Sequence, residues 1–179
     1  MPKVIERLDR PIVLVGLMGA GKSTIGRRLA RRLRLQFVDS DVAIEEAAGT
    51  STAELFERYG EQDFRDGEKR LVARLIDGSV RVIATGGGAF LDPDTRALLK
   101  ERAITVWLDA PVEILAERTG RRNNRPLLSK GNRAETLARL AEQRGAMYSE
   151  ALIHIRSGNG SHGQVVEAIV AALEEHLAR

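Results

Sequence analysis

The sequence contains no cysteine and few aromatic residues, with four Phe, two Tyr and one Trp among 179 residues. The absence of cysteine excludes disulfide bonds, zinc–thiolate sites and thiol nucleophiles. Basic and aromatic side chains are not interleaved, which argues against base stacking, so we expect no nucleic-acid partner. The pI of 9.6 at a net charge of only +3 reflects abundant arginine, and it is equally typical of proteins that bind small polyanions.

Long apolar runs are also missing. No stretch approaches the roughly 20 apolar residues of a transmembrane helix, and residues 1–10 are charged, unlike a signal peptide. We therefore expect a cytoplasmic protein with no membrane partner. The histidines lack metal-ligand spacing, and no G-x-S-x-G motif of serine hydrolases occurs. The length suits a single domain over residues 1–179, with its core at about 11–178.

What the sequence does contain is a glycine-rich loop, G-L-M-G-A-G-K-S, at residues 16–23. It matches G-x-x-x-x-G-K-[ST], a loop that holds phosphate with its backbone N–H groups at a helix N-terminus. The apolar run Ile12–Val15 precedes the loop and a helical pattern follows it, which favours this interpretation over a chance glycine-rich turn. The match predicts that Lys22 bridges two phosphates and that Ser23 offers its hydroxyl to Mg²⁺.

Apolar runs alternate with amphipathic helical stretches along the chain, which predicts an α/β fold with a parallel sheet. We expect strands at Ile12–Val15, Leu35–Val38, Val80–Ala84, Ile104–Leu108 and Leu152–Ile155. We expect helices at Lys22–Arg34, Asp41–Ala48, Thr52–Tyr59, Glu61–Asp77, Pro93–Glu101, Pro111–Thr119, Arg133–Ser149 and Gln164–Leu177. At least one helix joins each strand to the next, as parallel pairing requires.

Two carboxylates, Asp39 and Asp41, follow the second expected strand. Ligands of open parallel sheets lie beyond the carboxyl ends of the strands, and residues two apart in an extended segment point the same way. The pair therefore suits a nucleotide–Mg²⁺ site, with one carboxylate on the water shell of the ion and the other on a substrate hydroxyl. The alternative is that an aspartate caps the following helix.

Three consecutive glycines, within Thr85-Gly86-Gly87-Gly88, follow the third expected strand. Without side chains, this segment allows a ligand to approach the backbone, where N–H groups can donate to it. We interpret the segment as a wall of a pocket for a small polar substrate. The alternative is a flexible turn.

Charged residues on two expected helices are further candidates. Arg65 and Glu68 are three residues apart and share a helix face, as in an ordinary surface salt bridge or a functional pair. Arg144 is either a solvated side chain or a partner for a planar carboxylate, which arginine binds through two parallel hydrogen bonds. The polar, basic segment at residues 120–131 is either a solvated loop or a mobile lid that closes over phosphates, and the phosphate loop favours the lid.

These motifs, taken in order, resemble the shikimate kinase family from Ile12 to about Ile155. After the phosphate loop come Asp39-x-Asp41, G-E-Q-D-F-R at 60–65 with Glu68, T-G-G-G at 85–88, R-P-L-L at 125–128 and Q-R-x-x-x-Y at 143–148. The resemblance implies a nucleoside-monophosphate-kinase-like P-loop kinase fold in three layers, with a central five-stranded parallel sheet, helices on both faces and a mobile lid. It also implies ATP-dependent phosphorylation of the 3-hydroxyl of shikimate, giving shikimate 3-phosphate and ADP on the chorismate route to aromatic amino acids.

The resemblance assigns roles to individual residues. ATP would be bound by Gly19, Ala20, Gly21, Lys22, Ser23, Thr24, Arg118, the lid residue Arg125 and, beside adenine, Arg156. Shikimate would be bound by Asp41, Arg65, Glu68, Gly86, Gly87, Gly88 and Arg144, with Arg65 and Arg144 on its carboxylate and Glu68 orienting Arg65. One Mg²⁺ per subunit would be held by Ser23 and, through water, by Asp39. The catalytic residues would be Lys22, Asp41 and Arg125.

Two segments depart from the family pattern. The lid begins with the unusually basic stretch Arg121–Asn124, so Arg121 and Arg122 are alternatives to Arg125 at the transferring phosphate. The segment 156–160, where the family contacts adenine, varies, and residues 1–10 have no assigned role. We expect a monomer that uses ATP as co-substrate. The alternative function is that of a related small-molecule kinase, similar to a gluconate kinase or a nucleotide kinase.

Overall fold

A computed structural model describes residues 3–121 and 132–179 of the chain. Its strands form one sheet in the order β2-β3-β1-β4-β5, and every neighbouring pair is parallel. The strands are β1 (Ile12–Val15), β2 (Phe37–Asp39), β3 (Val82–Ala84), β4 (Ile104–Asp109) and β5 (Ile153–Arg156). The predicted five-stranded parallel sheet is thus confirmed.

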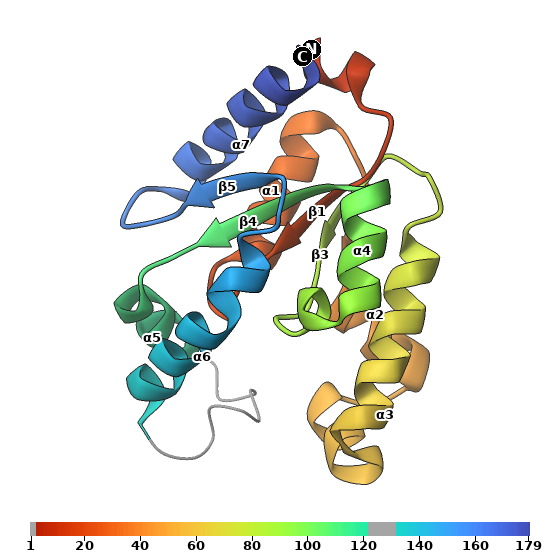
Figure 1. The fold of residues 1–179 in the computed structure, drawn as a ribbon, viewed down its shortest axis with the longest axis vertical. Coiled ribbons are helices and arrows are strands. Elements are labelled where there is room, and N and C mark those ends of the chain that lie inside the picture. Colours follow the sequence, from red (N-terminus) through yellow and green to blue (C-terminus); the bar gives the residue numbers. More distant parts are fainter. Residues whose placement is uncertain (1–2, 122–131) are drawn as a thin grey trace.

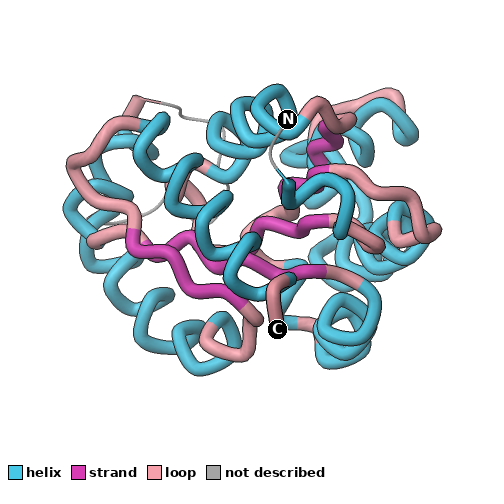
Figure 2. The backbone as a smooth tube through the Cα atoms, turned by 90° about the horizontal axis from the view of Figure 1, so that it is seen from above, coloured by secondary structure: helices cyan, strands magenta, loops and turns pink. Residues whose placement is uncertain are grey.

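Helices connect the strands and cover both faces of the sheet (Figures 1 and 2). The α-helices are α1 (Lys22–Leu33), α2 (Ser40–Ala48), α3 (Thr52–Leu75), α4 (Pro93–Arg102), α5 (Val112–Gly120), α6 (Arg133–Tyr148) and α7 (His162–Leu177). Two short 3₁₀ helices are η1 (Lys3–Arg7) and η2 (Ala89–Leu91). Helices α1 and α7 pack against each other on one face, and α4 lies against the sheet from the other face, where η2 joins it to α6.

The strands of the sheet are mostly apolar, as expected where helices cover both faces. All four residues of the central strand β1 are fully buried, as expected of a parallel strand flanked on both edges and both faces. One continuous apolar core surrounds it. Over the described residues, no helix combines the length and apolarity needed to cross a membrane.

Strand β2 begins two residues later than predicted and extends through Asp39. The reason lies in the end of α1, where Arg34 adopts a left-handed conformation (φ 56°). The Leu35 N–H then donates to the Ala30 carbonyl at 2.8 Å, which closes the helix and leaves Leu35 outside the sheet. Asp39 is consequently the last residue of the strand.

The chain between residues 52 and 75 follows the prediction of two helices with one difference. The structure joins them into α3, but Gly60 at the junction is non-helical (φ 81°, ψ 171°). A positive φ is accessible to glycine without a Cβ penalty, so Gly60 forms the kink between the two predicted segments.

The N-terminal residues contribute more than the sequence indicated. Helix η1 packs beside α7 (Figure 1), and Val4 is 1% exposed within the main core. Leu8 is buried there as well. The packed unit therefore extends upstream of residue 11, where the sequence placed its start.

Candidate active site

The strand order brings three loops to one edge of the sheet. Strands β1 and β3 are neighbours, with Leu14 opposite Ala84, and β2 lies beside β3, with Asp39 also opposite Ala84. The chain leaves β1 toward one edge of the sheet and leaves β3 toward the other, so the crevice beyond their carboxyl ends is a topological switch point. The phosphate loop, the aspartates and the triple glycine meet there.

A cleft of about 310 Å³ opens at this position. Its lining residues come from the phosphate loop and the starts or ends of several helices, and they include Gly19, Gly21, Lys22, Ser23, Thr24, Asp41, Thr85, Gly87, Arg118, Thr119, Arg121 and His162. The lining contains several cationic side chains, which suits a polyanionic ligand.

The phosphate loop wraps the N-terminus of α1. Gly19 and Gly21 have positive φ angles of 83° and 92°, which the curl of the loop requires. A Cβ on Gly19 would also lie 2.9 Å from the Thr119 side chain. Lys22, Ser23 and Thr24, in the first turn of α1, line the cleft, where the helix dipole favours an anion.

Two basic side chains rest on carbonyl groups of this loop. The Lys22 Nζ donates to the carbonyls of Gly16 and Leu17 at 2.7 and 2.9 Å, and Lys22 is 8% exposed. Arg118 Nη1 reaches across from α5 to the carbonyls of Gly19 and Ala20 at 3.3 and 3.4 Å. Both cations are therefore held at the place where a bound phosphate chain would lie.

A hydroxyl and a carboxylate lie together beside the loop. Ser23 Oγ donates to Asp39 Oδ2 at 2.5 Å, while Asp39 Oδ1 accepts the Asp41 N–H at 3.0 Å and caps α2. The N-cap alternative is thus confirmed, and it coexists with the contact to Ser23. Both groups are oxygen ligands of the kind that Mg²⁺ prefers.

Within residues 3–121 and 132–179, no group of three or more His, Asp or Glu side chains is placed to hold a metal ion. Mg²⁺ at nucleotide sites keeps several waters and takes phosphate oxygens beside one or two protein ligands, a number that Ser23 and Asp39 supply. The residues present therefore fit a Mg²⁺ ion that is shared with a nucleotide.

Asp41 lies in the first turn of α2 rather than in an extended segment, so the expectation that it parallels Asp39 along a strand is wrong. It still lines the cleft. A Cβ on Gly86 would come within 2.7 Å of Asp41 Oδ1 and 2.8 Å of Glu68 Oε2. The missing side chain at Gly86 therefore leaves the space that two carboxylates occupy.

The Gly86 N–H is not directed at the cleft as the sequence suggested. It donates to the hydroxyl of the fully buried Ser40 at 3.1 Å. The loop begins with a second anchor, because Thr85 Oγ1 donates to the Leu14 carbonyl at 2.8 Å. The triple glycine is therefore fixed at its start rather than a flexible turn.

Arg65 and Glu68 form a pair in which the glutamate is buried and the arginine is partly exposed. Arg65 Nη1 donates to Glu68 Oε1 at 2.9 Å, and the Glu68 side chain is only 4% exposed. Burial raises the pKa of Glu68, although the neighbouring Arg65 opposes the shift. Phe56 and Phe64 lie under the Arg65 guanidinium at 5.7 and 5.4 Å, so the cation has a defined position.

The second arginine reaches the triple glycine from α6. Arg144 is 9% exposed, and its Nη1 donates to the Gly87 carbonyl at 3.4 Å. Tyr148, one turn further along α6, donates its hydroxyl to the same carbonyl. Since Gly88 lies against the Arg65 guanidinium, the two arginines flank the triple glycine from separate helices.

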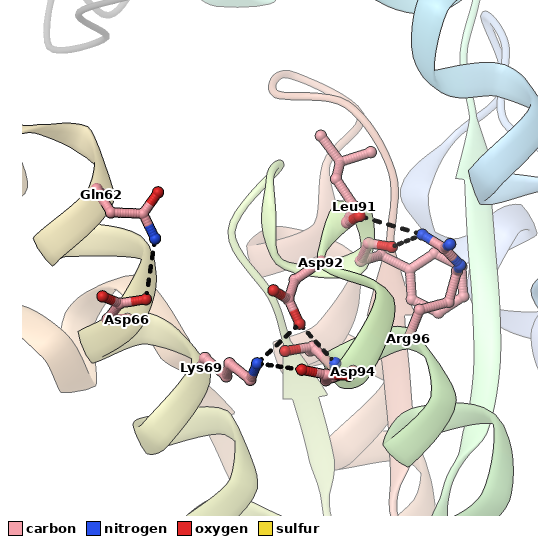
Figure 3. A network of polar contacts seen from close by, with 9 residues as sticks. Gln62, Asp66, Lys69, Leu91, Asp92, Asp94 and Arg96 are labelled. Atoms are coloured by element: carbon pink, nitrogen blue, oxygen red, sulfur yellow. Dashed lines mark hydrogen bonds and ion pairs between the residues drawn. The ribbon is translucent and has the colours of Figure 1, made fainter.

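The segment after the glycines is held by further polar contacts (Figure 3). Arg96 Nη1 donates to the carbonyls of Phe90 and Leu91 at 3.1 and 3.2 Å, and Lys69 of α3 pairs with Asp94 at 2.5 Å. These contacts tie η2 and the start of α4 to α3, the helix that carries Arg65. The glycine loop and the arginine are thus parts of one connected framework.

Some predicted residues are not placed in the cleft. Arg125 and Arg122 lie outside the described residues. Arg156 is exposed at the end of β5 and is not among the described residues that line the cleft, so its contact with adenine stays a prediction. The ATP residues of the loop and Arg118 do lie together.

Sequence reasoning gave no role to His162, which lines the cleft from the first turn of α7. Burial lowers its pKa, and the nearby Arg118 and Arg28 lower it further. Its position after the variable segment 156–160 was the only signal in the sequence. Tyr148 was also passed over, although it stood within the motif Q-R-x-x-x-Y.

Comparisons with known proteins agree with this geometry. A family model described as "Shikimate kinase" matches residues 18–174. The shikimate kinase of Rhodopseudomonas palustris is 50% identical over 169 residues, which cover 94% of this chain and 83% of that protein. That of Novosphingobium aromaticivorans is 49% identical over 179 residues, covering 98% and 93%.

A solved structure, the shikimate kinase of Acinetobacter baumannii in complex with shikimate, superposes with a TM-score of 0.91 at 38% identity. The match covers 95% of this chain and 96% of that one. The agreement of sequence and fold over nearly the whole length extends well past the phosphate loop, which many nucleotide-binding families share. By these matches, the chain belongs to the shikimate kinase family.

Proposed function

We propose that this protein transfers the γ-phosphoryl group of ATP to the 3-hydroxyl group of shikimate, giving shikimate 3-phosphate and ADP. One observation carries the proposal. Arg65 and Arg144, from separate helices, meet the triple glycine beside the phosphate loop. Two guanidinium groups there suit a carboxylate on the acceptor, which shikimate carries and a nucleoside monophosphate lacks.

The donor side of the cleft binds the nucleotide. Residues 19–24 provide backbone N–H groups, and Lys22 and Arg118 lie where they offset the charge of the phosphates. Ser23 and Asp39 would hold one Mg²⁺ per subunit, Asp39 through water, and the ion would neutralise phosphate charge. ATP binding would draw Lys22 from the loop carbonyls toward the phosphate chain.

The acceptor side positions the hydroxyl group. Asp41 is placed at the cleft beside Gly86, where its carboxylate is able to accept a hydrogen bond from the shikimate 3-hydroxyl and take up its proton. Gly87 and Gly88 provide a wall without side chains. Because the transition state of phosphoryl transfer is largely dissociative, alignment of the hydroxyl contributes more than the basicity of Asp41.

Arg125, within the predicted lid, is proposed as the third catalytic residue, with Arg121 as an alternative that already lines the cleft. An arginine that faces the transferring phosphate contributes a factor of about 10³ to 10⁵ in other NTPases. Closure of the lid only after shikimate binds would exclude water as a competing acceptor. A cytoplasmic monomer remains our expectation for the state of the enzyme.

ADP release, measured with ATP and Mg²⁺ in the presence of shikimate, gluconate or a nucleoside monophosphate, tests the proposal. Of these three acceptors, we expect only shikimate to support ADP release. The Asp41→Asn variant keeps the size of the side chain but replaces one acceptor oxygen by an NH₂ donor, so it should misalign the hydroxyl and reduce kcat about 10²-fold. Equal turnover with gluconate or a nucleotide, or none with shikimate, would contradict the proposal, and an effect of Asp41→Asn on KM alone would limit Asp41 to binding.

A further inference from the structure

Tyr148 is a buried polar residue to which the proposed mechanism gives no task. It is 1% exposed, and its ring lies 5.9 Å from that of Trp107 on β4. Its hydroxyl donates to the Gly87 carbonyl, which also accepts the long 3.4 Å hydrogen bond from Arg144. Tyr148 and Arg144 are four residues apart on α6, so one helix face brings both donors to the same acceptor.

The two donors differ in what else they can do. A phenol hydroxyl has one proton to donate, whereas the guanidinium of Arg144 has five N–H donors in a planar fork. A carboxylate takes two parallel N–H donors of this fork, and turning Nη1 toward it would give up the long contact to Gly87. The partly buried carbonyl would then lose a donor, and a carbonyl left without a hydrogen bond at such a site is unfavourable.

We propose that Tyr148 is a positioning residue that keeps the Gly87 carbonyl hydrogen-bonded, so that the fork of Arg144 is free for the carboxylate of the acceptor. The inference rests on the proposed function, because it assigns Arg144 to that carboxylate. This role of Tyr148 explains why the Gly87 carbonyl makes its longer hydrogen bond with Arg144 and its shorter one with Tyr148. Tyr148 itself does not touch the substrate.

The protonation state and packing of Tyr148 agree with this role. Burial raises the pKa of its hydroxyl, although Arg144, which hydrogen-bonds to it, and Arg65 act in the opposite direction. The phenol therefore stays protonated and able to donate at neutral pH. The contact with Trp107 holds the ring on the side that faces Gly87.

The other anchors of the loop do not replace Tyr148. Ser40 holds the Gly86 N–H, and Arg96 holds the carbonyls of Phe90 and Leu91 (Figure 3). The Gly87 carbonyl lies between these points and has Tyr148 and Arg144 as its donors. Loss of the hydroxyl would leave Arg144 as the donor at this position.

Tyr148→Phe removes only the hydroxyl. Arg144 should then stay on the Gly87 carbonyl, so we expect the KM for shikimate to rise about tenfold, with kcat changed less than about twofold and the KM for ATP unaltered. Tyr59→Phe is the matched control, because Tyr59 is the other tyrosine of the chain and is 60% exposed. It should leave all three constants unchanged.

A double-variant cycle separates positioning from general packing. In an Arg144→Ala background, Tyr148→Phe should add no further increase in the shikimate KM, since the residue through which it acts is gone. An unchanged KM in the single variant, or an equal increase in both backgrounds, would overturn the role. If the wild-type enzyme does not phosphorylate shikimate at all, the proposed function fails first and this role fails with it.

A measurement on the wild-type protein covers the case in which Tyr148→Phe does not fold. The ¹³C chemical shift of the Gly87 carbonyl reports its hydrogen bonding. On addition of shikimate we expect it to remain that of a hydrogen-bonded carbonyl, and Trp107, the only tryptophan, to report binding by its fluorescence. A shift to a free carbonyl on saturation with shikimate would contradict the proposal.

Discussion

At the scale of single residues, a buried carboxylate lies behind the triple glycine and holds one of the two arginines that meet it. Glu68 is 3% exposed, and within the described part of the chain its Oε2 has no hydrogen-bond partner. Its other oxygen holds Arg65 at 2.9 Å. Burying a charge with only one partner is unfavourable, so Glu68 orients the arginine at a cost in stability.

The raised pKa of Glu68 predicts a pH dependence of stability. Because the folded-state pKa lies above the ordinary value of 4.5, the contribution of Glu68 is fully present below that value and is lost as pH rises through the folded-state pKa. Glu68→Gln should remove this loss, so the variant should gain stability relative to the wild type as pH rises from 4.5. Urea unfolding at a series of pH values measures the difference.

Glu61→Gln is the control for this experiment. Glu61 also lies near Arg65, at 3.8 Å, but its side chain is 64% exposed. The free energy of unfolding of Glu61→Gln should equal that of the wild type at all pH values. If the curve for Glu68→Gln also runs parallel to the wild type, Glu68 does not titrate abnormally in the folded protein.

Gly88→Ala should disturb the carboxylate site without unfolding the protein. The new Cβ would lie 2.5 Å from Arg65 Cζ, and the guanidinium is the movable end of a long side chain. Arg65 should therefore move, and the KM for shikimate should rise about tenfold or more while the KM for ATP stays the same. Steady-state kinetics decide, and an unaltered shikimate KM would remove Arg65 from the site.

At the scale of elements, α3 combines two helices that differ in direction. Its second half carries Arg65, which lies against Gly88 and pairs with Glu68, and Lys69, which pairs with Asp94 at the start of α4. The non-helical backbone of Gly60 interrupts α3 between the two halves. The glycine at the junction and the glycine inside the second half, Gly67, therefore have different effects on the helix.

Two alanine substitutions in α3 should change stability in opposite directions. At Gly67 a Cβ meets nothing closer than 4.0 Å, so Gly67→Ala should stabilise the protein by about 0.5–1 kcal/mol through helix propensity. Gly60 has as much space but φ 81°, so Gly60→Ala should destabilise it by about 1 kcal/mol. Thermal unfolding tests both, and effects of the same sign would contradict the assigned kink.

At the scale of the whole molecule, the cleft depends on contacts between distant segments. The phosphate loop, α2, the triple glycine, α5 and α7 line it, and α3 and α6 bring Arg65 and Arg144 to the glycines. On the far side of the sheet from α4, η1 packs beside α7, which in turn packs on α1. The N-terminal residues thus support the helix that starts at the phosphate loop.

Val4→Ala should weaken this support. Val4 is 1% exposed in the core, so its truncation should lower the free energy of unfolding by about 2 kcal/mol. Glu6→Ala in the same short helix is the matched control, because Glu6 is exposed and should have little effect. Comparable losses from both variants, or none from Val4→Ala, would show that η1 does not belong to the core.

The sequence by itself determined the features that local chemistry encodes. The alternation of apolar and helical patterns predicted the five parallel strands, and the phosphate loop needed only its glycines, lysine and serine at fixed spacing between a strand and a helix. Boundaries were less predictable. The hydrogen bond from the Leu35 N–H to the Ala30 carbonyl at the end of α1 keeps Leu35 out of the predicted strand. Helix η1 joins the core by packing against α7, which lies far away in the sequence.

Only the tertiary structure decided how the polar side chains are used. Strand order placed Asp39 and Thr85 beside the phosphate loop, and the Ser40 hydroxyl accepts the Gly86 N–H. The Arg65–Glu68 pair joins a partly exposed arginine to a buried glutamate. These outcomes depend on packing between segments tens of residues apart, which no local pattern contains. A residue type and its spacing define what chemistry is available, whereas partners and burial define which part of it operates.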